Sequence, residues 1–166
     1  MTVTEAGTDR AEGAAERAEH EAFARQANRE TWDWLARDDR TAVDDERMIH
    51  AAHASAFHWA AVGGAQASTR ADWLLSHVYA VLGHAEPALR YARHCLATCE
   101  REGMGGVDLA YAYEAMARAS AADHDGPAAS GWRAKAAAEG AAIADDDDRQ
   151  LFLADLAAGP WFGVSP

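Results

Sequence analysis

Histidine offers the widest choice of chemistry in this sequence, and the chain contains eight of them. His50 and His53 are three residues apart, a spacing that puts both on one face of a helix. Neutral imidazoles placed in this way can share a metal ion, and a carboxylate or a water can complete the ligand set. Residue counts from the turn expected near 64 put His77 level with both. These three residues therefore form a candidate site for zinc, copper or iron.

The same histidines also have a purely structural interpretation. Imidazoles are common on half-buried helix faces, where one ring nitrogen bonds a neighbour. The sequence has no HExxH pair, no GxSxG nucleophile motif and no phosphate-binding glycine loop. Ser76 and His77 are adjacent on a predicted helix, so they do not face each other as a nucleophile and its base would. The sequence leaves open whether the chain is an enzyme, and the catalytic residues are unknown.

The elements that would position these residues are predicted to be helices. Alanine, the strongest helix former, is the commonest residue, and no segment alternates as a strand would. Helices are expected over about 10–37, 44–62 and 66–82, then from a first turn that contains Pro87 to 101, over 108–122 and 127–144, and in a short last helix that starts at the aspartates 145–148. The expected domain organisation is a flexible tail over 1–8, one helical domain over 9–158 and a C-terminal tail over 159–166. Short connections predict antiparallel neighbours, either stacked as hairpins or closed into a bundle.

Composition excludes several kinds of partner. The chain has 166 residues and a formal net charge of −12, which disfavours binding to nucleic acid and to anionic membranes. No apolar run is long enough for a membrane-spanning helix, and the N-terminus does not resemble a signal peptide. The two cysteines, Cys95 and Cys99, are one helical turn apart, where a disulfide would add little stability. A reduced, cytoplasmic protein is therefore expected.

The segment 71–96 has the residue pattern of a repeated helical hairpin. A large–small pair is followed by an aromatic residue, a turn glycine and a series of small residues: Leu75, Ser76, Tyr79, Gly83, Ala88, Ala92 and Cys95. This segment resembles a tetratricopeptide repeat. A second, divergent copy has Met116, Ala117, Ala129 and Ala136 at matching positions, but Ser120 replaces the aromatic residue and His124 the turn glycine. Ala129 lies 41 residues after Ala88, whereas the family period is 34.

The resemblance implies a concave groove lined by the first helix of each hairpin. Its residues in this chain would be Arg70, Trp73 and His77 from the first copy and Tyr111, Glu114 and Arg118 from the second. We expect an exposed surface that mixes aromatic and charged groups and suits a peptide, a protein partner or a small polar ligand. His50 and His53 would lie near its edge or floor. The alternative is that Trp73 and Tyr111 are core residues.

Three classes of function follow from these observations. The first is a non-catalytic tetratricopeptide-like module that binds a ligand in its groove. The second is a small metal-binding protein or metalloenzyme that uses the histidines, and the third is a structural subunit that forms homo-oligomers through its terminal helices. The packing positions of the repeat are expected to be buried: Leu75, Tyr79, Ala88, Ala92, Leu96 and Met116.

Overall fold

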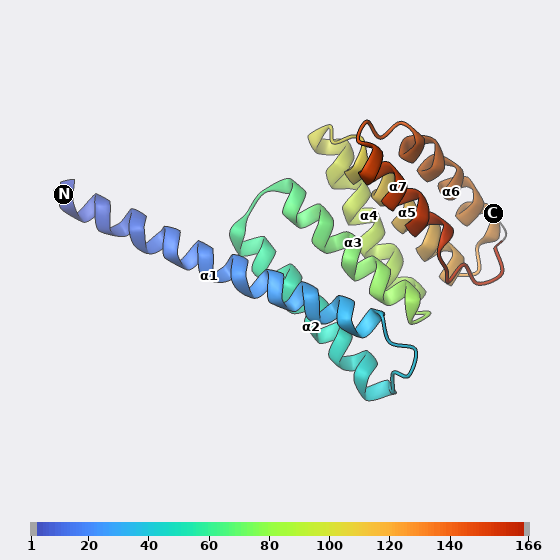
Figure 1. Cartoon of the computed structure of the whole chain (residues 1–166), viewed down its shortest axis with the longest axis horizontal. Coiled ribbons are helices and arrows are strands. Elements are labelled where there is room, and N and C mark those ends of the chain that lie inside the picture. Colours follow the sequence, from blue (N-terminus) through green and yellow to red (C-terminus); the bar gives the residue numbers. More distant parts are fainter. Residues whose placement is uncertain (1–2, 165–166) are drawn as a thin grey trace. The chain divides into compact units, whose positions relative to one another are not determined.

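A computed structural model of the chain describes residues 3–164, with side chains from residue 13 onward. This part folds entirely into helices and turns (Figure 1). The helices are α1 (Val3–Leu35), α2 (Ala42–Val62), α3 (Ala65–Val81), α4 (Ala85–Glu102), α5 (Val107–Ala122), α6 (Gly126–Ala141) and α7 (Asp146–Ala157). The predicted all-α fold is confirmed, and every predicted helix is present. The main difference is α1, which begins at Val3 and not near residue 10.

The chain divides into two compact units, residues 1–67 and residues 68–166, and each is described by itself. The predicted single domain over 9–158 stays a prediction. Residues 1–2 and 165–166 of the two predicted tails lie outside the described residues. Within the described part of the chain, no helix combines the length and the apolar character that are needed to cross a membrane.

The N-terminal unit is an antiparallel hairpin of α1 and α2. Small side chains allow the helices to approach closely, and the Ser55 hydroxyl donates a hydrogen bond to the carbonyl of Ala24 at 3.1 Å. Thr41 starts α2 with a capping box: its hydroxyl accepts from the Asp44 N–H, and the Asp44 carboxylate accepts from the Thr41 N–H. This reciprocal arrangement satisfies backbone donors that a helix start leaves unpaired.

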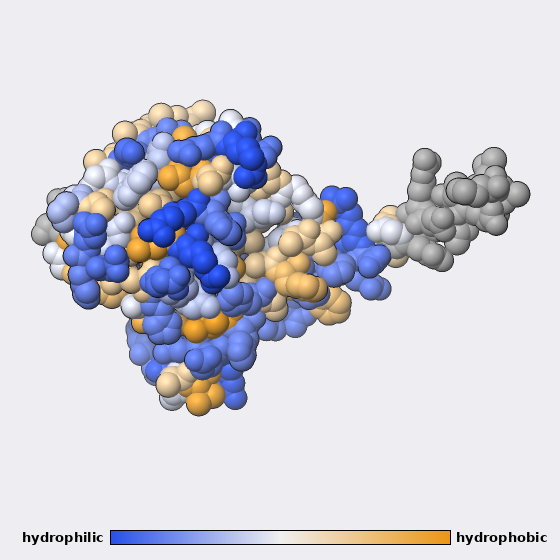
Figure 2. Space-filling model, turned by 180° about the vertical axis from the view of Figure 1, so that it is seen from behind, coloured by the Kyte–Doolittle hydropathy of each residue, from blue (hydrophilic) through white to orange (hydrophobic). Residues whose placement is uncertain are grey.

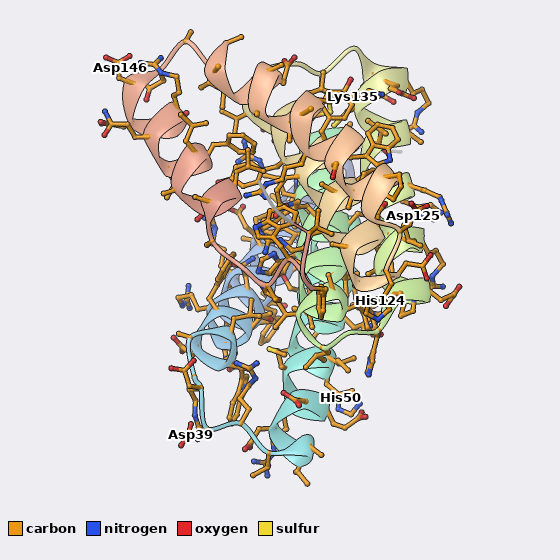
Figure 3. The ribbon with its side chains drawn as sticks, turned by 90° about the vertical axis from the view of Figure 1, so that its right-hand side faces the viewer. Asp39, His50, His124, Asp125, Lys135 and Asp146 are labelled. Atoms are coloured by element: carbon orange, nitrogen blue, oxygen red, sulfur yellow. The ribbon has the colours of Figure 1, made fainter. Side chains whose placement is uncertain are left out.

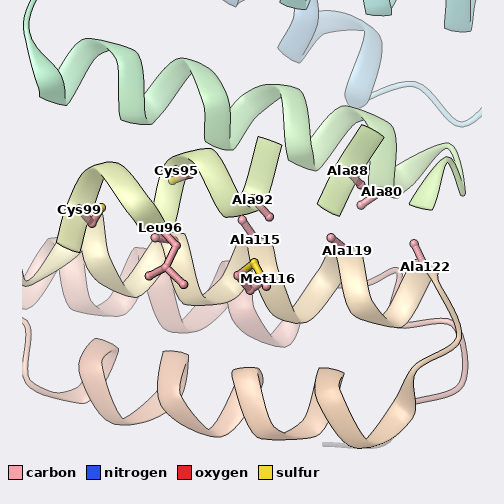
Figure 4. Close-up of a cluster of buried hydrophobic side chains, with 11 residues drawn as sticks. Ala80, Ala88, Ala92, Cys95, Leu96, Cys99, Ala115, Met116, Ala119 and Ala122 are labelled. Carbon is pink, nitrogen blue, oxygen red and sulfur yellow. The ribbon is translucent and has the colours of Figure 1, made fainter. Parts of the chain in front are cut away.

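The C-terminal unit has a first apolar core between α3, α4 and α5 (Figure 4). Alanines dominate this core, so the helices lie close together and leave little room for larger side chains. Five of the six positions predicted to be buried are buried: Leu75, Ala88, Ala92, Leu96 and Met116. Tyr79 is only partly buried, although it packs against the same core.

A second apolar core joins α5, α6 and α7. Phe152 and Leu156 of α7 are buried here beside Ile143, and Tyr111 packs its ring edge-on against Phe152 at 4.9 Å. Asp145 caps the start of α7 by accepting hydrogen bonds from the backbone N–H groups of residues 147 and 148. The space-filling view in Figure 2 shows a mostly hydrophilic surface with small, separate hydrophobic patches.

Candidate functional site

Five of the six predicted ligand-binding residues meet in the C-terminal unit. Trp73 and His77 extend from α3, and their rings stack with centroids 5.2 Å apart. The Trp73 ring also meets Tyr111 of α5 at 5.0 Å, in an edge-on arrangement. Glu114 and Arg118 follow on α5 at spacings of three and four residues, so they lie on the same face as Tyr111. We call these five residues the inner polar cluster.

Glu114 is at the centre of the inner polar cluster. One carboxylate oxygen, Oε2, accepts the indole N–H of Trp73 at 2.9 Å. The other oxygen, Oε1, accepts from Nε of Arg118 at 2.5 Å. Both members of this ion pair are buried, so each compensates the charge that the other brings into a region from which water is excluded. The ion pair lies within α5, and the Trp73–Glu114 hydrogen bond connects α3 to it.

The prediction that the groove residues are exposed is wrong for Glu114 and Arg118, the two charged residues of the cluster. The side chain of Glu114 is 1% exposed and that of Arg118 is 2% exposed. Trp73, His77 and Tyr111 are partly buried. The physical reason is that α7 and the residues after it pack on this face of α5 and exclude water from it. Arg70 alone remains exposed, where it forms an ion pair with Asp108 at 2.9 Å.

Burial also changes the titration of the cluster. It lowers the pKa of His77 from 6.5 to about 4, with the nearby Glu114 carboxylate opposing the shift. His77 is therefore a neutral imidazole at pH 7. Burial likewise raises the pKa of Tyr111 above its usual range, and the hydroxyl donates to Oδ2 of Asp155 at 2.6 Å. At neutral pH the cluster thus presents one compensated ion pair among neutral rings.

The C-terminal segment, which we define as residues 155–161, is held on the cluster by two arginines. Arg118 donates through Nη2 to the carbonyl of Asp155 at 3.2 Å and through Nη1 to that of Ala158 at 3.3 Å. Arg133 of α6 donates to the carbonyl of Leu156 at 3.3 Å. These carbonyls lie at the C-terminal end of α7, where helix carbonyls lack internal partners and the dipole favours cations.

Trp161 completes this contact. The guanidinium carbons of Arg118 and Arg133 lie 4.5 Å and 4.3 Å from the centre of its ring. Cations at such distances are attracted to the indole π-system. Sequence reasoning missed Asp155, Arg133 and Trp161 as parts of the site. A large aromatic residue directly after Gly159-Pro160, in a segment expected to be a tail, is the signal that could have identified Trp161.

The predicted metal ligands belong to different units: His50 and His53 lie on α2, and His77 lies on α3 beyond the unit boundary. His50 is exposed on α2 (Figure 3), beside a cavity of about 630 Å³ that Glu30, Asp33 and Trp34 also line. No group of three or more His, Cys, Asp or Glu residues that could hold a metal ion occurs among the residues that the structure describes. The site of His50, His53 and His77 stays a prediction.

A histidine pair in the N-terminal unit was not predicted from the sequence. The Nδ1 atoms of His20 and His58 lie 2.9 Å apart, so one ring must donate and the other accept. Phe23 and Phe57 lie against this pair, with ring centroids 5.3 Å and 5.2 Å from His58. The pairing joins α1 to α2 near the end of α2.

Comparisons with known proteins add no relative. A scan of family models, a search of curated proteins and a search of solved structures each found no match to this chain.

Proposed function

We propose that this protein is a non-catalytic, tetratricopeptide-like helical module that binds a peptide or a segment of a protein partner at the inner polar cluster. The first helices of the two repeats in this reading are α3 and α5, and they supply Trp73 and Tyr111 to the same cluster. The observation that carries the proposal is the contact between the two arginines and the main chain of the C-terminal segment.

The chemistry of that contact is the chemistry of peptide recognition. Arg118 and Arg133 donate to three backbone carbonyls, which every peptide has, and both approach the ring of Trp161. Backbone contacts provide affinity for a helix end, and an aromatic anchor provides selectivity. In this reading the chain's own C-terminal segment occupies the groove, and an external peptide with a helix end followed by tryptophan competes for the same position.

The competition can be measured with the full-length chain. A fluorescently labelled peptide of residues 155–166 is titrated with the unmodified protein, with Trp161→Ala and with Phe162→Ala as the matched control, since Phe162 is 37% exposed. We expect Trp161→Ala to bind the peptide more tightly than the other two proteins, because its internal competitor has lost the anchor. A peptide with alanine in place of its tryptophan should bind all three weakly.

Two outcomes would contradict the proposal. The peptide could bind all three proteins equally, which would place its contact elsewhere on the chain. Alternatively, Trp161→Ala could lower the unfolding midpoint and bind no peptide, in which case the C-terminal segment is a permanent cover of α5.

A further inference from the structure

A separate cavity lies between α6 and α7 in the C-terminal unit. Its volume is about 370 Å³, within the size range of sites for small molecules. Five apolar side chains form most of its wall: Ala134, Ala137, Leu153, Leu156 and Ala157. Arg133 and Ser130 supply the polar groups. The cavity thus offers apolar surface with a single positive charge.

No carboxylate among the described residues compensates the charge of Arg133. Within the described part of the chain, Arg133 forms no ion pair, and its contacts are the Leu156 carbonyl and the ring of Trp161. Its Nη1 is buried without a hydrogen-bond partner among these residues, and so is Nε1 of Trp161. Both atoms are closed off from the cavity, so a ligand there would meet only the accessible part of the Arg133 guanidinium and its positive charge.

The surroundings define the class of ligand. A guanidinium pairs well with a carboxylate, because its planar donors match the two oxygens. The alanine and leucine wall favours a hydrocarbon body and supplies no second cation for a phosphate group. In a chain of net charge −12, this local cation in an apolar site is the feature that would attract an anion.

We propose that the cavity between α6 and α7 binds a small carboxylic acid with an unbranched apolar chain. The carboxylate pairs with Arg133, and the chain lies on Ala134, Ala137 and Leu153. The cavity contains none of the five residues of the inner polar cluster, but it shares Arg133 and Leu156 with the contact that holds the C-terminal segment. The test below uses no peptide, so its result is separate from that of the peptide titration.

Octanoate is the probe for this proposal, and binding to the full-length protein is measured by titration calorimetry. Octanol and octylamine have the same chain without the negative charge and serve as ligand controls. We expect octanoate to bind at one site and both controls to bind at least tenfold more weakly. Equal binding of octanol, or no binding of octanoate, would overturn the proposal.

Two variants test the location of the site. Arg133→Gln should weaken octanoate binding at least tenfold, whereas Arg149→Gln should not, because Arg149 already interacts with Asp146 and the Ile143 carbonyl. Ala137→Leu places bulk on the cavity wall at an exposed position, so it should reduce binding while the unfolding midpoint changes little. Unchanged octanoate affinity in both Arg133→Gln and Ala137→Leu would overturn the proposed site. Arg133→Gln alone does not decide it, because that variant also loses a contact to the backbone of α7.

Discussion

Gly140 of α6 lies directly against the ring of Phe152 of α7. A Cβ atom at position 140 would lie 2.2 Å from Cε1 and 2.3 Å from Cδ1 of that ring. Phe152 is fully buried, so its ring has no free space into which it could move. The absence of a side chain at Gly140 is therefore what allows α7 to pack on α6 at this point.

The first prediction compares two glycines on the same helix. Gly140→Ala should lower the free energy of unfolding by about 1–3 kcal/mol, because overpacking outweighs the better helix propensity of alanine. Gly131→Ala is the control: a Cβ atom at position 131 would have no other group within 4 Å, so this change should raise the free energy of unfolding by up to about 1 kcal/mol. Urea unfolding measures both. A stabilised Gly140→Ala would mean that α7 does not pack on α6 as described.

The second prediction concerns the buried ion pair. Glu114→Gln keeps the shape of the side chain but leaves the Arg118 charge uncompensated, which should cost about 3–5 kcal/mol. Glu21→Gln removes the same charge from an exposed pair with Arg25 and should cost no more than about 1 kcal/mol. Chemical unfolding of both variants decides the comparison. Similar losses in the two would show that water reaches Glu114.

The third prediction tests the close approach of α3 and α4. Ala88 is fully buried, and its carbonyl accepts the Ser76 hydroxyl at 3.0 Å. Ala88→Leu should therefore overpack this contact and cost about 1–3 kcal/mol. Ala97→Leu, at an exposed position of α4, should change stability by less than about 0.5 kcal/mol. An unfolding midpoint that Ala88→Leu leaves unchanged would show that the two helices are not in close contact.

The fourth prediction is a dependence of stability on pH. The pKa of His77 is 6.5 in a free chain and about 4 when folded, so between these values the unfolded state binds more protons. The contribution of His77 therefore increases the free energy of unfolding as pH rises from 4 to 6.5 and is lost as pH falls through that window. His77→Gln should show a flatter pH profile in this range. An unchanged slope would mean that His77 is accessible to protons in the folded state.

The fifth prediction is a pH dependence of stability that has the opposite sign to that of His77. Its pH range overlaps the range in which His77 titrates. Burial raises the pKa of Asp72 from 3.8 to about 6, so here the folded state binds more protons between these values. Its contribution to the free energy of unfolding therefore falls as pH rises from 3.8 to 6. Asp72→Asn removes this term, so the stability of the variant relative to the unmodified protein should increase over that range. A constant difference between the two proteins would contradict the assignment.

The sequence alone was sufficient for the number of helices and for the ends that a glycine or proline marks, although not for the start of α1. Alanine-rich segments interrupted at Gly83, Gly103 and Pro127 determine local conformation through backbone propensity, which needs no tertiary contact. At Gly103, for example, φ is 64° and the N–H bonds back to the last turn of α4, as a glycine after a helix commonly does. The spacing of Trp73 with His77 and of Glu114 with Arg118 also predicted which residues share a helix face.

Only the tertiary structure decided whether that face is open or covered. Arg118 is buried where the C-terminal segment packs on it, and Glu114 is buried with Trp73 and Arg118 as its partners. The contacts that join Arg118 to Asp155 and Ala158 depend on the path of α6 and α7, which no local spacing encodes. Helical periodicity identifies a stripe of residues, but burial depends on which distant segment packs against that stripe.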